Sequence, residues 1–431
     1  MYQKKKHLSK KKRKQLIKEH ISEYERLDYK IMLTVLLLCA YGIVMIYSAS
    51  SFKCSITAKY NFDSFYFAKK QIIFVIAGVI ASGIIARYLN YNWIKPFSKV
   101  IYLLGVGSIF LLLTPLGISS YGAVRWIGIG PVSLQVAEVV KIALIVILSG
   151  LSCRYARRMS RYKTLLTLWV VGAVPCILLF ILSNDLSSAI ILAGITFGMT
   201  FVVTPWKKLH YSIVLLTVLG VAFFITYFMN NLPSAQELSD QNFRVGRIAA
   251  WLNPEAFADG QGYQPLQALY AVAHGGITGT GLGKGVQKLT SIPEAQNDMI
   301  FAVICEELGL FGAAILIFLF CYLLYQLFRV AISCKDLFGS SLVTGIILHI
   351  ALQTLINLSV VLGVIPNTGA SLPFISSGGT AVFMTLCEIG LALSVYRRYV
   401  ERHIIARYEE SKEEIKQTEP AQFSRRRTIS R

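Results

Sequence analysis

The chain has 431 residues, of which 55% are hydrophobic and only 15% are charged, and its mean hydropathy is +0.56. Soluble proteins carry about 25% charged residues, so this composition excludes an ordinary soluble enzyme and indicates a helical membrane protein. The formal net charge of +20 could suggest a nucleic-acid partner. The basic runs at residues 4–18 and 425–431 flank membrane spans, however, which favours cytoplasmic tails near anionic lipid and argues against nucleic acid.

The eight cysteines are spread along the chain without a CxxC pair or a Cys/His cluster. A disulfide framework and a structural zinc site are therefore not indicated.

Apolar runs long enough to cross a bilayer as a helix, about 20 residues each, recur along the whole chain. We expect an all-α polytopic membrane protein with ten transmembrane helices, at about residues 31–50, 71–90, 100–118, 134–151, 164–182, 186–204, 210–230, 298–328, 337–362 and 379–397. One long extracytoplasmic loop, residues 231–297, joins the seventh and eighth spans. A basic cytoplasmic tail (1–30) precedes the membrane domain (31–398), and a second cytoplasmic tail (399–431) follows it.

The distribution of basic residues predicts the orientation. If the N-terminus is cytoplasmic, the inner segments hold 33 of the 43 Lys and Arg residues, the outer segments hold 9, and Lys141 lies inside a span. Cytoplasmic loops of membrane proteins carry the excess of Lys and Arg. We therefore expect both termini in the cytoplasm.

The segment from Tyr121 to Val146 combines a glycine-rich outer loop with the start of the fourth span. We expect the loop to be bent and closely packed, with Arg125 as its only charge. Glu138 and Lys141 follow inside the apolar helix and share one face. They form either a buried ion pair between helices or the wall of a polar pocket.

Two further outer segments hold candidate substrate-binding residues. Asp185 lies in a tight turn, where it either caps the next helix or faces the same vestibule as Arg125. In the long loop, Arg244 and Arg247 share one face of a short amphipathic helix. Two guanidinium groups suit a phosphate or diphosphate, and headgroup snorkelling is the alternative. A run of glycines between Gly275 and Gly285 would let backbone N–H groups approach a ligand, although it matches no nucleotide-binding motif.

The stretch from Lys284 to Gly312 gathers carboxylates in a chain that is otherwise poor in them. Asp298 falls where a polar segment meets a long apolar run. Burial at such a boundary raises the proton affinity of a carboxylate, so Asp298 is our candidate base. Lys288 and Glu294 are candidate substrate-binding residues in the same stretch.

The ninth and tenth spans are joined by a proline- and glycine-rich segment, residues 357–383, which contains no charge. Broken backbone at membrane depth is tolerated only where it is buried in protein or lines a cavity. Ser376 and Gly378 are therefore candidate substrate-binding residues. Glu388 lies alone in the last span, where a contact between helices is the expected role.

Four segments closely resemble the SEDS family (shape, elongation, division and sporulation), and the resemblance covers about Asp28 to Arg398. These segments are GAVRWIGIGPVSLQVAEVVK, SNDLSSA, PEAQNDMIFAVICEELGLFG and VVLGVIPNTGASLPFISSGGT. The resemblance places the family's proposed catalytic aspartate on Asp298. It also places the arginine and Glu/Lys pair of the fourth span on Arg125, Glu138 and Lys141.

The chain departs from the family pattern at several neighbouring positions. Val136 and Ala137 replace the common Pro-Ser, Gln296 and Asn297 replace the usual His-Thr, and Met299 replaces a phenylalanine. The PDLGTA turn is Asn184 to Ala189 here. Fine substrate preference is the property that these changes affect.

The resemblance implies a peptidoglycan glycosyltransferase of the bacterial cytoplasmic membrane that polymerises lipid II at the outer face, closer to the division type than to the elongation type. It implies an inverting transfer assisted by a divalent cation, Mg or Mn, for which Asp298 is the candidate ligand. The expected partners are lipid II, a class B penicillin-binding protein and other division or elongation membrane proteins. A lipid-linked precursor transporter (flippase) and a scaffold for division enzymes are the alternatives.

Overall fold

The structure is a computed structural model that describes Gln15 and residues 27–120, 123–129, 132–230, 243–290 and 292–428. Within these residues, ten helices are long and apolar enough to cross a membrane, which confirms the all-α polytopic class. The spanning helices are α2 (Leu27–Ile56), α3 (Tyr66–Tyr88), α4 (Tyr91–Phe110), α5 (Val136–Arg154), α6 (Tyr162–Leu182), α7 (Leu186–Val203), α8 (Lys207–Asn230), α13 (Ile300–Ser333), α14 (Leu337–Val361) and α15 (Gly379–Thr428). The basic N-terminal tail lies outside the described residues, apart from Gln15 and residues 27–30, which belong to α2.

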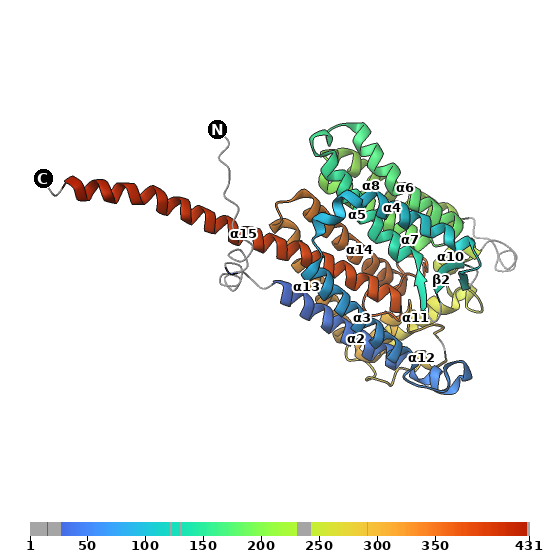
Figure 1. The fold of residues 1–431 in the computed structure, drawn as a ribbon. Coiled ribbons are helices and arrows are strands. Elements are labelled where there is room, and N and C mark those ends of the chain that lie inside the picture. Colours follow the sequence, from blue (N-terminus) through green and yellow to red (C-terminus); the bar gives the residue numbers. More distant parts are fainter. Residues whose placement is uncertain are drawn as a thin grey trace.

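The interior of the bundle is built around α5 and α14, which pack against each other and against α7. α5 is buried over most of its apolar window, whereas α8 lies at the edge and contributes none of its window to the interior. A helix that is apolar all round is stable at either place, because its surroundings are protein or hydrocarbon. α15 packs along α3 and then continues as one helix away from the bundle, past residue 397 where we expected the span to end (Figure 1).

The segment that we expected to be a bent loop after the third span contains a small antiparallel sheet. Its strands are β1 (Gly117–Ser120), β2 (Ala123–Ile129) and β3 (Val132–Gln135), in the order β1-β2-β3. β2 is rich in β-branched and aromatic residues, which favour strands. Val124 pairs with Ser119 and Trp126 pairs with Ile118, so Arg125 is the extra residue of a β-bulge. A bulge re-aims a side chain, and here the re-aimed side chain is the only charge of the sheet.

Short helices fill the long segment between α8 and α13. They are α10 (Phe243–Leu252), α11 (Tyr263–Gly275) and α12 (Gln287–Thr290). A 3₁₀ turn, Glu255–Phe257, lies between α10 and α11, and the described residues contain three more, at Ala58–Tyr60, Leu111–Leu113 and Ala156–Arg158. α11 packs against the first half of α13, which brings the long loop over the N-terminal end of that helix.

α13 is bent at Gly309, whose φ of 64° and ψ of −165° lie in a region that only glycine adopts readily. The glycine run that follows α11 packs against this bend. The backbone N–H groups of Thr280 and Gly281 donate to the carbonyls of Glu306 and Glu307, each at 2.9 Å. The run therefore clamps the bent helix and satisfies carbonyls that the bend releases, instead of presenting these N–H groups to a ligand.

Candidate functional site

Asp298 lies in the turn just before α13 and is half-buried. Gln264 of α11 donates from Nε2 to the Asp298 carboxylate Oδ1 at 3.5 Å and to the carbonyl of Pro293 at 3.1 Å. Asn357 of α14 donates from Nδ2 to the main-chain carbonyl of Asp298 at 2.7 Å and to the carbonyl of Ala370 at 2.7 Å. Two helices and the segment after α14 thus fix the position of this carboxylate.

Arg125 and Arg247 both lie near Asp298. A methyl group at Gly369 would come 3.5 Å from Arg125 Nη1 and 3.8 Å from Asp298 Oδ2, so the two groups flank the same glycine. Arg247 donates from Nη1 to the carbonyl of Asn367 at 3.2 Å. Burial is the main cause that lowers the pKa of Arg247; the charge of Arg125 lowers it further, and Asp298 raises it. Arg247 is therefore within electrostatic reach of both partners.

Burial raises the pKa of Asp298 to about 6, and the charge of Glu294 adds to this increase. A hydrogen bond that the carboxylate accepts from the Asp298 backbone N–H, together with the charges of Arg247 and Arg125, lowers the pKa without cancelling this increase. Since desolvation penalises the ionised form, this carboxylate binds a proton more readily than an exposed one does. A carboxylate with a pKa near 6 suits general-base chemistry at neutral pH.

The expected substrate-binding residues Glu294 and Lys288 are held in different ways. Glu294 adopts a left-handed φ of 52° and accepts hydrogen bonds from Lys53 at 3.2 Å, Gln296 at 3.0 Å and Asn297 at 2.9 Å. It therefore organises the turn that leads to Asp298. Lys288 is buried, donates to Ser48 Oγ at 2.9 Å and forms an ion pair with Glu307. Its charge is thus matched inside the protein.

Asp185 caps α7, as one of our two interpretations predicted. Its carboxylate accepts from the Ser188 N–H at 3.1 Å and from the hydroxyls of Ser187 and Ser188, each at 2.7 Å. The carbonyl of Asn184, in the same turn, accepts from Arg125 Nη2 at 3.4 Å. The turn therefore supports Arg125 through its backbone, while its carboxylate is used in the cap.

Glu138 and Lys141 form the buried ion pair that was one of two alternatives, with an N–O distance of 2.8 Å. Lys141 also donates to Gln353 of α14 at 2.7 Å, so the pair joins α5 to α14. Glu388 contacts His349 of α14 at 2.8 Å, which is the contact between helices that we expected.

Ser376 and Gly378 shape the segment between α14 and α15. The Ser376 hydroxyl accepts from the Leu372 N–H at 2.7 Å, and the Ser376 carbonyl accepts from Gln71 at 3.3 Å. Gly378 accepts the N–H of Val382 at 2.9 Å at the start of α15. Ser376 therefore holds the end of the segment that contains Gly369, whereas Gly378 supports the first turn of α15. The side chain of Arg244, at the start of α10, lies outside the described part of the structure.

Several polar residues of the site were not predicted from the sequence. Gln264 and Asn367 are joined by a hydrogen bond of 3.0 Å and connect α11 to the segment after α14. His349, Gln353 and Asn357 recur every four residues on one face of an apolar helix, a pattern that is visible in the sequence. That spacing was the available signal for a polar stripe pointing into the bundle.

In the described residues, no three His, Cys, Asp or Glu side chains gather in a way that could hold a metal ion. Mg²⁺, in contrast, commonly binds one or two carboxylates together with substrate phosphates. The Asp298 carboxylate, which accepts a long hydrogen bond from Gln264 and is bordered by a glycine, fits that second mode.

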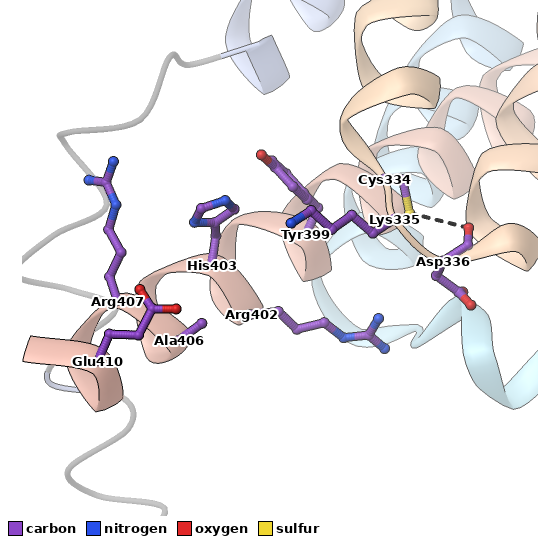
Figure 2. Close-up of a pocket in the computed structure, with 9 residues that line it drawn as sticks. All are labelled: Cys334, Lys335, Asp336, Tyr399, Arg402, His403, Ala406, Arg407 and Glu410. Atoms are coloured by element: carbon purple, nitrogen blue, oxygen red, sulfur yellow. Dashed lines mark hydrogen bonds between the residues drawn. The ribbon is translucent and has the colours of Figure 1, made fainter. Parts of the chain in front are cut away.

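A pocket of about 230 Å³ lies far from Asp298, at the other end of α13. Figure 2 shows Arg402 and His403 of α15 facing Lys335 and Asp336, which join α13 to α14. With 34 residues in α13, a straight helix would separate the two ends by about 50 Å. This pocket is therefore not part of the Asp298 site.

Residues 29–400 match the cell cycle protein family FtsW/RodA/SpoVE. The chain is 35% identical over 383 residues to stage V sporulation protein E of Bacillus subtilis, covering 86% of this chain and 98% of the relative. It is 34% identical over 382 residues to a protein of Geobacter metallireducens named probable peptidoglycan glycosyltransferase FtsW, covering 88% and 97%.

Two solved structures share the fold. A chain from a peptidoglycan synthase complex superposes with a TM-score of 0.68 at 24% identity, covering 87% of this chain and 98% of the other. The rod shape determining protein RodA of Thermus thermophilus superposes with a TM-score of 0.60 at 21% identity, with the same coverage of both chains. Together with the sequence matches, these findings confirm the resemblance that the motifs indicated: the chain belongs to the FtsW/RodA/SpoVE family of cell cycle proteins.

Proposed function

We propose that this protein is a peptidoglycan glycosyltransferase that polymerises lipid II at the outer face of the bacterial cytoplasmic membrane. The observation that supports this most strongly is one half-buried carboxylate, Asp298, with a raised pKa and two arginines within electrostatic reach. The family relatives named as peptidoglycan glycosyltransferases support the same reaction class. Lys and Arg are in excess in the segments on the side of the membrane opposite to Asp298, which supports cytoplasmic termini.

In the reaction, the 4-hydroxyl of one lipid-linked disaccharide attacks the anomeric carbon of another. Asp298 takes the proton from this hydroxyl as the new glycosidic bond forms. The bond between the anomeric carbon and the diphosphate breaks, and the electron pair leaves with undecaprenyl diphosphate. A single displacement inverts the anomeric centre.

The leaving diphosphate develops negative charge that needs fixed donors. Arg125 and Arg247 lie on the sheet and on α10, each held by a main-chain carbonyl. Guanidinium groups match phosphate oxygens with parallel N–H donors, so the pair is suited to a diphosphate. Arg125 Nε is buried and has no partner within the described residues, which leaves one donor available for such a ligand.

A divalent cation, Mg or Mn, would be held by Asp298 together with the substrate diphosphate. When bound, such an ion lowers the energy of the negative charge that develops on the phosphate oxygens. The residues of this chain act with it by orienting the carboxylate through Gln264 and by supplying the two guanidinium groups.

The partner expected for such a polymerase is a class B penicillin-binding protein, which cross-links the strands as they form. The fold shared with a chain of a peptidoglycan synthase complex supports this partnership. A role in division follows the relatives named FtsW, and other membrane proteins of division would then assemble with it.

The test is strand synthesis from purified lipid II in liposomes that contain the protein and its penicillin-binding partner. Asp298→Asn should abolish strand growth, because an amide cannot accept the proton. The matched control is Asp63→Asn, an exposed carboxylate of the first outer loop paired with Lys69 at 2.8 Å, which should leave synthesis unchanged. Strand growth by the Asp298 variant at the wild-type rate contradicts the proposal. Movement of lipid II between leaflets without strand growth would identify a transporter instead.

A further inference from the structure

α14 contains a stripe of buried polar residues that the proposed reaction uses only at one end. Asn357 contacts the main chain of Asp298, whereas Gln353 and His349 lie one and two turns deeper. His349 is 1% exposed and Gln353 is 4% exposed. Polar groups buried at this depth are costly unless every one has a partner, so their contacts indicate what they do.

Gln353 is bonded on both sides of its amide. Its Oε1 lies 2.7 Å from Lys141 Nζ and 2.8 Å from His349 Nε2, and its Nε2 donates to the carbonyl of Ser371 at 3.0 Å. An ammonium can only donate and a carbonyl can only accept, which fixes the orientation of the amide. His349 Nε2 must then hold a hydrogen and donate it to Gln353.

The second ring nitrogen of His349 contacts a buried carboxyl group. Nδ1 lies 2.8 Å from Glu388 Oε2 of α15. With Nε2 already protonated, the two groups share one further proton, as imidazolium and carboxylate or as imidazole and carboxylic acid.

The network ends at the segment that borders the candidate site. Ser371 follows Ala370, whose carbonyl accepts from Asn357 at 2.7 Å. Gly369, which lies close to Arg125 Nη1 and Asp298 Oδ2, comes directly before Ala370. A continuous series of contacts therefore leads from Glu388 through His349 and Gln353 to the backbone beside the candidate base.

We propose that His349 is a positioning residue: through Gln353 it fixes the segment 366–371, and so the space beside Arg125 and Asp298, while Glu388 holds the imidazole ring of His349 in place. This inference rests on the proposed function of Asp298. It assigns the pair no proton transfer in the reaction. Only the hydrogen bonds matter, and any side chain that restores the same donors and acceptors should replace the original.

The first test compares His349→Gln with His349→Asn in the lipid II assay. A glutamine amide occupies the place of Nε2 and can still donate to Gln353, whereas an asparagine amide replaces Nδ1 and leaves Gln353 without its donor. His349→Asn should lower kcat roughly 10- to 100-fold with little change in KM, while His349→Gln stays within roughly threefold of wild type. Equal loss, or no loss, in both variants overturns the proposal.

The second test is Glu388→Gln. The glutamine amide can donate to Nδ1 of a neutral His349, so the hydrogen bonds of the network are kept although the carboxyl group is removed. The value of kcat should therefore be retained. Loss of kcat in this variant would show that the carboxyl group itself is required, as in a proton relay, and overturns the positioning role. The control is Gln326→Leu, which removes a buried amide of α13 that contacts Thr34 of α2 at 3.3 Å, away from this network. This substitution should leave kcat unchanged.

Hydrogen exchange over residues 364–378 measures positioning without any reaction. His349→Asn should accelerate exchange there, and His349→Gln, Glu388→Gln and Gln326→Leu should not. Unchanged exchange in His349→Asn contradicts the inference even if activity falls. If the wild-type protein makes no strands from lipid II, the proposed function fails, and the exchange result still decides whether this network positions the segment.

Discussion

Arg125 and Asp298 both lie beside Gly369, with a virtual methyl at this glycine 3.5 Å from the guanidinium Nη1 and 3.8 Å from the carboxylate Oδ2. The residues come from a β-bulge and from the turn before α13, 173 positions apart in the sequence. The glycine leaves the space between a cation and a base open to a substrate group. Its φ of 73° also favours glycine at this position.

Gly369→Ala should therefore lower both activity and stability. The left-handed backbone costs an alanine about 1 kcal/mol or more, and its methyl group occupies the space between the two side chains. The matched control is Gly363→Ala, which has a similar φ of 69° and only the side chain of Leu269 nearby. The thermal unfolding temperature should fall by a similar amount in both variants, and the rate of strand synthesis should fall further in Gly369→Ala. Equal activity of the two variants would show that the space beside Asp298 is not used.

The rate of strand synthesis should depend on pH through Asp298. A base must be ionised to act, and burial raises the pKa of this carboxyl from 3.8 to about 6. Activity should accordingly be full above this value and decline as the pH falls through about 6. The measurement is kcat/KM for lipid II between pH 4.5 and 8. A rate that stays constant down to pH 5 would show that the group acting as base has a lower pKa.

Arg247→Gln should change both the rate and its pH dependence. Loss of a fixed donor beside a developing charge lowers kcat by roughly 100-fold, within the range measured for single donors in other enzymes. Because the charge of Arg247 lowers the pKa of Asp298, its removal should also shift the acid limb of the profile to higher pH. The control is Lys59→Gln, which replaces an exposed cation in the loop between α2 and α3 and should alter neither the rate nor its pH dependence. An unshifted acid limb would place Arg247 out of electrostatic reach of the base.

Gly309→Ala should affect the stability of the fold more than the rate of strand synthesis. The backbone at this bend lies in the region where strain for other residues is about 1–3 kcal/mol, and a Cβ would meet the backbone of Ile277 and Gly279. Gly83→Ala in α3 is the control, since no atom lies within 4 Å of its virtual Cβ. The unfolding temperature measured in detergent should be lower for Gly309→Ala and unchanged or higher for Gly83→Ala. A stable Gly309→Ala protein would mean that the glycine run does not depend on this bend.

Hydropathy was sufficient to predict the ten spans, because a spanning helix needs a long apolar run whatever its neighbours are. Asp298 could be singled out because a carboxylate beside an apolar run is rare. The ends of α4 and α15 could not be predicted, since polar residues at a helix end extend it by local capping and packing instead of by hydropathy. The bulge at Arg125 also escaped prediction, because strand pairing depends on register and not on composition.

The glycine run after α11 shows a second limit of the sequence. Glycines indicate close approach of backbone, but the approaching partner is a matter of tertiary structure. Here the N–H groups of Val286 and Gln287 donate to Glu306 at 2.8 and 3.1 Å, and Gly283 donates to Glu307 at 3.0 Å. Two buried carboxylates of the chain itself thus accept from N–H groups that, from the sequence, could have approached a ligand.

Because Arg125 is the extra residue of a β-bulge, deleting it should remove function without disrupting the fold. Removing one residue from a regular strand would turn every later side chain to the opposite face. Here the flanking residues already pair with consecutive positions of β1, so excision of Arg125 leaves an unbroken ladder. We expect the single-residue deletion to insert into membranes and unfold at the wild-type temperature while making no strands; unfolding at a much lower temperature would contradict this. Deletion of a single codon could therefore abolish the activity of this protein while the folded protein remains in the membrane.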